Sequence, residues 1–393
     1  MAQPTLLWNA DAPYAGLVGV GAIGTGLFFA LEGGHTLGRN ESRPARLLDV
    51  RDYCKLHIIA HYVAVLLGAS ADHRGFHVLP VAKVGEDSAG RSMLNEMIRA
   101  GMDIRGVWTV KDRPTTLSVC FQYPDGSGGN ITTSDSAAAA LDAPDVDSAL
   151  AFLRAPGNRY MALAAPEVPI QVRHHLLRRA SQLGAFRVVC LTSADAVSEE
   201  RHALLELADL VAMNEDEASA LTGLPFPADD PRPFLNHCAA LLQSYHSRVR
   251  ILMSAGSLGA FAFDGSGWVH HPALSVPVAS SAGAGDALLA GVLSALAVGI
   301  PLTVPRPRPA SVRHHPLDSA LDLGVILASF SVTSPHTIHP DARLETLLAF
   351  AQQHDLVTSK NSNWKHCPAK EGNRASQISS LSNGSSQRST TTE

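Results

Sequence analysis

Short apolar runs alternate with longer amphipathic stretches along most of this chain. The apolar runs at residues 16–21, 76–81, 159–164, 186–191, 207–213 and 249–254 predict buried strands. Helical periodicity follows at residues 52–67, 88–100, 170–183, 199–207 and 232–246. This alternation is typical of βαβ units. We therefore expect a doubly wound α/β fold, with a mostly parallel sheet and helices on both of its faces.

One region departs from this rhythm. Residues 104–110, 115–123 and 130–133 have the pattern of short antiparallel strands, with a turn at 124–126 and no helices between them. Together with residues 25–45 they predict a small β-sheet lid on the α/β domain. Such a lid could also pair two copies of the chain as a homodimer.

The same pattern suggests one domain over residues 1–357 and a tail over 358–393. The tail is rich in Ser, Thr and Asn and almost lacks large aliphatic residues, so we expect it to be disordered. A proline- and arginine-rich stretch at 300–316 predicts an irregular surface insertion between two helices.

Composition narrows the class of protein. The 393 residues are 46% hydrophobic and carry a net charge of −5, which argues against a nucleic-acid partner. The longest uncharged stretch, 287–304, is broken by Gly299 and Pro301, so we expect no membrane span. Five scattered cysteines without a CxxC motif indicate reduced thiols and a cytoplasmic location.

The strongest chemical signal is AGAGDA at residues 282–287. It follows a strand-like run at 273–278 and opens a helical stretch that reaches 298. Small residues allow backbone N–H groups to approach an anion, and a helix N-terminus adds positive partial charge. Asp286 on the first turn could accept a proton from a substrate hydroxyl. On spacing alone, a tight turn with Asp286 as a helix cap explains the motif equally well.

Several segments, taken in order, resemble the PfkB/ribokinase family of small-molecule kinases. They are AGAGDA at 282–287, NEDE at 214–217, SAGSLG at 254–259, VAKVGEDSAG at 81–90 and APEVP at 165–169. The resemblance extends over roughly residues 16–357. It implies a ribokinase-like fold and transfer of the ATP γ-phosphoryl group to a hydroxyl of a sugar or sugar-like small molecule.

The resemblance also implies roles for individual residues. Asp286 becomes the general base, and Gly283, Ala284 and Gly285 form the anion hole. Asn214 and Glu217 belong to the magnesium and phosphate network, with Mg²⁺ held by Glu217 through water. Ser254, Gly256 and Gly259 flank ATP, and Glu167 lies near the acceptor.

Three departures from the family pattern concern the acceptor and the ions. The segment GAIGTGL at 21–27 lacks the carboxylate that usually grips substrate hydroxyls. In YCKLHI at 53–58, only Lys55 remains of a Gly-Gly-Lys-Gly-x-Asn segment. Ser280 stands where an Asp is usual, which puts activation by a monovalent cation in question. We therefore expect an acceptor unlike ribose or fructose, bound by replacement groups: Asp52, Lys55, Arg39 and Asn40.

Two other functions remain open at this point. GVGAIG at 19–24 fits the GxGxxG dinucleotide pattern after a strand, which would indicate an NAD-dependent dehydrogenase. The lost acceptor residues would also suit a non-catalytic binding or regulatory protein that has kept the fold, although the AGAGDA motif argues against it.

Overall fold

A computed structural model describes residues 6–70, 75–125, 128–304, 318–354 and 367–368. In this part of the chain a large sheet has ten strands in the order β14-β13-β12-β11-β10-β9-β8-β1-β4-β5. Its parallel strands are β1 (Gly16–Val20), β4 (His77–Gly85), β5 (Val107–Val110), β8 (Tyr160–Ala164), β9 (Phe186–Cys190), β10 (Leu210–Asn214) and β11 (Arg250–Ser254). Antiparallel strands β12 (Ala260–Phe263), β13 (Gly267–His271) and β14 (Cys367–Pro368) extend one edge.

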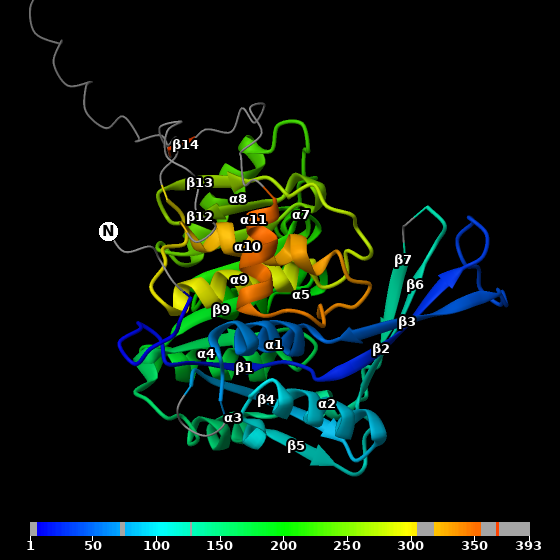
Figure 1. Ribbon diagram of the computed structural model, residues 1–393, viewed down its shortest axis with the longest axis horizontal. Helices are drawn as coiled ribbons and strands as arrows, with labels where there is room; N and C mark the ends of the chain where they lie inside the picture. Colours follow the sequence, from blue (N-terminus) through cyan, green and yellow to red (C-terminus); the bar gives the residue numbers. More distant parts are fainter. Residues whose placement is uncertain (1–5, 71–74, 126–127, 305–317, 355–366, 369–393) are drawn as a thin grey trace, which may run out of the picture.

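Helices cover both faces of this sheet (Figure 1). One layer contains α1 (Lys55–Leu67), α2 (Ser88–Arg99), α9 (Ala284–Ala297), α10 (Ala320–Ser331) and α11 (Leu344–Gln353). The other contains α3 (Ala143–Leu150), α4 (Ile170–Gln182), α5 (Ser193–Val197), α6 (Arg201–Leu205), α7 (Glu215–Thr222) and α8 (Arg232–Tyr245). Successive side chains on a strand point to opposite faces of the sheet and pack against different helix layers, as Leu17 and Val18 do on β1. The predicted fold class is confirmed.

A second sheet projects from the α/β body as a lid (Figure 1). Its order is β3-β2-β6-β7, formed by β2 (Gly24–Leu31), β3 (Ala45–Tyr53), β6 (Thr116–Gln122) and β7 (Gly128–Thr132). The side chains alternate between two faces. Leu27, Leu47, Leu117 and Ile131 are exposed on one face. The opposite face carries Asp52 and Ser118. The homodimer expected through this lid stays a prediction.

Three structural assignments predicted from the sequence are wrong. Residues 107–110 form β5 of the large sheet, because β4, α2 and β5 make one more βαβ unit. Residues 52–53 belong to β3 of the lid, so α1 begins only at Lys55. Residues 273–278, expected as a strand, have no regular structure.

Most of the predicted tail, and residues 305–317 of the proline-rich insertion, lie outside the described residues.

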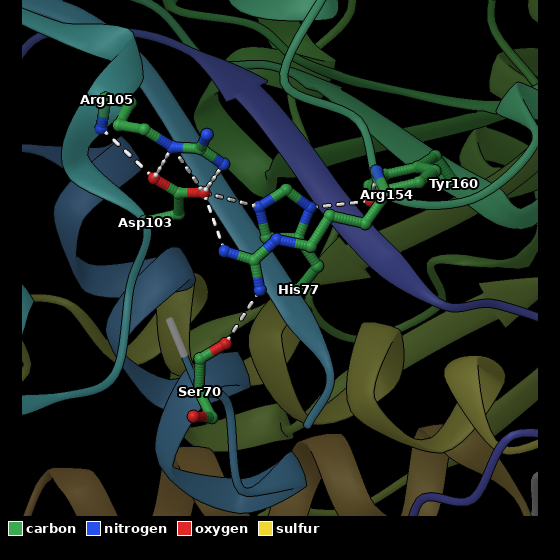
Figure 2. A network of polar contacts seen from close by, with 6 residues as sticks. All are labelled: Ser70, His77, Asp103, Arg105, Arg154 and Tyr160. Atoms are coloured by element: carbon green, nitrogen blue, oxygen red, sulfur yellow. Dashed lines mark hydrogen bonds and ion pairs between the residues drawn. The ribbon is translucent and has the colours of Figure 1, made fainter. Parts of the chain in front are cut away.

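The amino ends of the central strands are held together by a buried polar network (Figure 2). The His77 ring lies 2.6 Å from the Tyr160 hydroxyl through Nδ1 and 3.0 Å from Asp103 through Nε2. Arg105 and Arg154 both donate to Asp103. Burial lowers the pKa of His77 to about 4, so the ring is neutral at pH 7. Burial alone would raise the pKa of Asp103, but the hydrogen bonds from Arg105 and His77 hold it below its usual range.

We predict that Asp103→Asn destabilises the fold by at least about 3 kcal/mol, because it removes the buried carboxylate that pairs with Arg105 and Arg154. Asp103 is 4% exposed. The matched control is Asp147→Asn, which breaks the exposed ion pair with Arg179 and should cost about 1 kcal/mol or less. Chemical denaturation measures both variants. Equal losses in the two would contradict a structural role for the network.

Candidate active site

The carboxyl ends of the parallel strands open into a cavity of about 920 Å³. The predicted residues that line it are Lys55, Asn214, Glu217, Ser254, Gly256, Gly259, Gly283, Ala284, Gly285 and Asp286. They come from four regions of the chain. They meet here because parallel strands end at the same edge of the sheet, which is where α/β folds bind ligands.

The AGAGDA turn forms the N-terminus of α9. Gly283 has a positive φ of 79°, which reverses the chain just before the helix. Within the described residues, the N–H groups of Gly283, Gly285 and Asp286 have no hydrogen-bond acceptor, whereas that of Ala284 donates to the Ser281 carbonyl at 3.2 Å. Free amides at the start of a helix of 14 residues form a site suited to an anion.

Asp286 forms an ion pair at the mouth of this turn. Its Oδ1 lies 2.8 Å from Nζ of Lys55, at the start of α1, and its side chain is 12% exposed. Burial alone would lower the pKa of Lys55, but the Asp286 carboxylate, with Cys190 and Glu217 nearby, raises it. Lys55 is therefore charged at pH 7. The pair places a cation and a carboxylate side by side at the N-terminus of α9.

Asn214 and Glu217 have a structural role as well as a place in the cavity. The Asn214 side chain accepts the Glu217 N–H at 2.7 Å, and Glu217 accepts the Asn214 N–H at 2.8 Å, so the two form the capping box of α7. Burial raises the pKa of Glu217, with Asp286 and Asp195 adding to the rise and Lys55 opposing it. A divalent cation here would relieve the repulsion among these carboxylates.

This donor set fits Mg²⁺ held mainly by water and phosphate. Mg²⁺ prefers oxygen ligands and is usually bound through one or two carboxylates together with substrate phosphates. In the part of the chain that the structure describes, no group of three or more His, Cys, Asp or Glu side chains could hold a metal by itself.

The other predicted nucleotide residues border the same cavity. Ser254, at the end of β11, has its hydroxyl 3.6 Å from where a Cβ on Gly285 would lie. Gly256 begins the following turn beside Glu215. Gly259 also serves packing, because a Cβ there would lie 2.2 Å from the His271 carbonyl oxygen.

A scan against family models matches residues 63–343 to the pfkB family carbohydrate kinases. The chain belongs to the pfkB family of carbohydrate kinases. Among curated relatives, it is 25% identical over 221 residues to a bifunctional ribokinase/ribose-5-phosphate isomerase A of Fructilactobacillus sanfranciscensis, covering 56% of this chain and 39% of that protein. It is 35% identical over 108 residues to a probable chloroplastic fructokinase-6 of Arabidopsis thaliana, covering 27% and 26%. The matches thus span well under half of each relative's length.

Solved ribokinases share the fold of this pfkB protein. The enzyme of Giardia lamblia superposes with a TM-score of 0.70 at 15% identity, covering 86% of this chain and 99% of that chain. The Arabidopsis thaliana ribokinase complexed with ribose and ATP gives 0.63 at 18%, covering 88% and 100%. The Cryptococcus neoformans ribokinase in complex with ADP gives 0.63 at 20%, covering 85% and 98%.

The acceptor residues predicted from the sequence fall into two groups. Asp52 lies on the face of the lid that carries Ser118, and Glu167 lies beside Lys55. Arg39 and Asn40 are exposed in the turn between β2 and β3, at the outer end of the lid and away from α9 (Figure 1). The fold therefore does not bring Arg39 and Asn40 to Asp286.

Glu167 lies beside the N-terminus of helix α1. The N-cap residue Cys54 makes no side-chain cap. The Glu167 carboxylate is close enough to the Cys54 thiol and the Lys55 backbone N–H for both to lower its pKa. The Glu167 residue is exposed as a whole. Loss of solvation around its carboxylate nevertheless raises its pKa to about 7. The charge of Lys55 opposes this rise, and that of Asp286 adds to it.

The glycines of GVGAIG are explained by packing. A Cβ on Gly21 would lie 2.6 Å from Leu56, and one on Gly24 would lie 2.3 Å from the Thr116 carbonyl oxygen. The motif leads into β2 of the lid, whereas a dinucleotide fingerprint leads into a helix. The dehydrogenase hypothesis is therefore not supported.

Sequence reasoning missed the apolar wall of the cavity. Val276 and Val278 contribute from the irregular stretch before α9, and Val325, Ala328 and Val332 contribute from α10 and its end. Cys190, at the end of β9, lines the floor beside Lys55. The only sequence signal was an apolar stretch at 273–278 that was interpreted as a strand.

We predict that Glu217→Gln keeps the capping of helix α7 but weakens the binding of Mg²⁺. Glutamine can still accept the Asn214 N–H, so the melting temperature should change little, whereas the loss of charge should raise the Mg²⁺ concentration needed for nucleotide binding by about tenfold. Calorimetric titration at varied Mg²⁺ measures this. The control, Glu217→Ala, should lower stability as well by about 1 kcal/mol. An unchanged Mg²⁺ requirement in Glu217→Gln would leave Glu217 as a helix cap only.

Proposed function

We propose that this protein transfers the γ-phosphoryl group of ATP to a hydroxyl of a sugar or sugar-like small molecule. The observation that carries the proposal is the Asp286–Lys55 ion pair at the start of α9, beside amides that have no acceptor in the described part of the chain. Phosphoryl transfer depends on positioning and charge stabilisation, and this arrangement supplies both.

In the proposed reaction, Asp286 removes the proton of the acceptor hydroxyl as its oxygen bonds to the γ-phosphorus. The bond between that phosphorus and the β–γ bridging oxygen breaks, and ADP leaves. The amides of Gly283, Gly285 and Asp286 and the Lys55 ammonium stabilise the charge on the transferring oxygens. Mg²⁺, bound near Glu217, would neutralise charge on the phosphates. Val276, Val325 and Val332 would pack against the base of ATP.

Asp52 supplies the acceptor carboxylate that residues 21–27 lack. It pairs with Gly26 across the lid, and a Cβ on Gly26 would lie 2.1 Å from its Oδ2. Strand β3 thus places the Asp52 carboxylate over β2, in the segment where the family usually has a carboxylate. The Cys120 thiol donates to Asp52 at 3.5 Å, and burial raises the pKa of this half-buried carboxyl. Asp52 would accept hydrogen bonds from acceptor hydroxyls.

We predict that Asp286→Asn lowers turnover by about a hundredfold or more, because a general base contributes roughly that much. Asparagine keeps the shape and can still accept a hydrogen bond from Lys55, so ATP affinity should stay near that of the wild type. The test is ADP release in a screen of purified protein against sugars, nucleosides, sugar acids and vitamin-like alcohols, followed by kinetics on the acceptor found.

Each result of that screen decides between the two functions that remain. Turnover that depends on both acceptor and Asp286 supports the kinase. A protein that binds ATP but phosphorylates no acceptor would favour the non-catalytic binding function. Full activity in Asp286→Asn would contradict the proposed mechanism.

We predict that Asp52→Asn lowers kcat/KM for the acceptor by about tenfold or more, as expected for the loss of a charged hydrogen-bond partner. The KM for ATP should be unchanged, because Asp52 lies on the lid and not in the nucleotide cavity. Asp49→Asn, an exposed carboxylate on the same strand, is the control and should have no effect. Equal effects on the acceptor and ATP parameters would refute the assignment of Asp52 to the acceptor.

A further inference from the structure

The segment that follows α10 contacts the turn that carries the free amides. The Val332 carbonyl accepts the N–H groups of Ala279 at 2.8 Å and Ser280 at 3.3 Å, just before the turn. Thr337, which is 1% exposed, packs on Gly283. A Cβ on Gly283 would lie 2.9 Å from the Thr337 carbonyl oxygen and 3.0 Å from its Cβ. Thr337 therefore lies in direct contact with the turn and leaves no room for a side chain at Gly283.

The same threonine is bonded to the lid. Its N–H donates to the Arg51 carbonyl at 3.1 Å, and its Oγ1 donates to that carbonyl at 3.3 Å and accepts the Tyr53 N–H at 3.2 Å. The neighbouring His336 accepts the Arg51 N–H through Nδ1 at 3.1 Å. Since β3 is an edge strand of the lid, these bonds pair polar groups that would otherwise lack a partner.

These bonds hold the backbone on both sides of Asp52. Arg51 and Tyr53 present their N–H groups to residues 336–337, while Asp52 between them faces β2, where it pairs with Gly26. A third contact joins α1, the helix that begins with Lys55: the Tyr62 hydroxyl donates to the Thr337 carbonyl at 3.4 Å. All three polar groups of Thr337 are thus engaged.

We propose that Thr337 is a positioning residue that couples the lid strand β3 to the anion-hole turn of α9. Movement of residues 51–53 is transmitted through one buried side chain to Gly283, and movement of Gly283 is transmitted back, since such coupling is reciprocal. If the protein is the kinase proposed above, an acceptor that draws in Asp52 also adjusts the amides that bind the transferring phosphoryl group.

Amide hydrogen exchange of the ligand-free protein tests the coupling without any substrate. Gly283→Ala forces a Cβ against Thr337, so exchange at the Arg51 and Tyr53 amides should rise by about tenfold or more. The control is Gly223→Ala, which introduces the same strain at a positive φ of 70° but has no neighbour within 4 Å of the new Cβ. It should leave residues 51–53 as in the wild type. Unchanged exchange at Arg51 and Tyr53 in Gly283→Ala would overturn the proposal.

Thr337→Val and Thr337→Ser change the residue that contacts both the lid strand and the turn. They remain informative if Gly283→Ala fails to fold. Valine removes the acceptor of the Tyr53 N–H, so exchange should rise by about tenfold at Tyr53 and also at Ala287, whose N–H donates to the Gly283 carbonyl at 2.9 Å. Serine keeps the hydroxyl and should restore protection at both amides. A rise at Tyr53 alone would reduce Thr337 to a local lid contact and contradict the coupling.

Kinetics on an identified acceptor supply the second readout. Thr337→Val should weaken the dependence of acceptor KM on ATP concentration, whereas a merely structural role would lower all parameters together. Inactivity of the wild-type protein with every acceptor would count against the proposed function, and the exchange results would still decide the coupling.

Discussion

The site depends on backbone N–H groups where α9 begins, which have no acceptor among the described residues. A helix cannot satisfy its first amides internally, and here a left-handed Gly283 turns the chain into α9 at the lining of the cavity. The Lys55–Asp286 ion pair lies at the same place, so the fold concentrates positive partial charge around one carboxylate. The other parts of the cavity, from the capping box of α7 to the end of β11, are arranged around this point.

The part of the site proposed to bind the nucleotide could be predicted from the sequence because it is built from local motifs. Asn214 and Glu217 are three residues apart in one capping box, and residues 283–286 form one turn, so the geometry within each motif is local. Their roles in the site came from the family resemblance. These motifs also follow strands of a parallel sheet, which sets them along one edge. Their order along the chain therefore predicted which residues would meet.

The part of the site proposed to bind the acceptor could not be predicted in the same way because it depends on strand register. Asp52 reaches its place only because β3 pairs with β2 and aligns it with Gly26, and a shift of one residue would turn it to the other face. The sequence pattern assigned residues 52–53 to a helix, since the helical periodicity of α1 continues into them. No local signal indicated that residues 336–337, nearly three hundred positions away, would bond to this strand.

Cys54 and Glu167 show how the chain accommodates a changed acceptor loop. In the segment YCKLHI the family's flexible glycines are replaced by Tyr53 and Cys54, which cannot cap α1 with a side chain. Glu167 comes from the loop after β8 and has a positive φ of 71°, which is unusual for a residue other than glycine. This conformation goes with a carboxylate beside the N-terminus of α1. Residues 51–55 thus contact Glu167 at one end and Thr337 at the other.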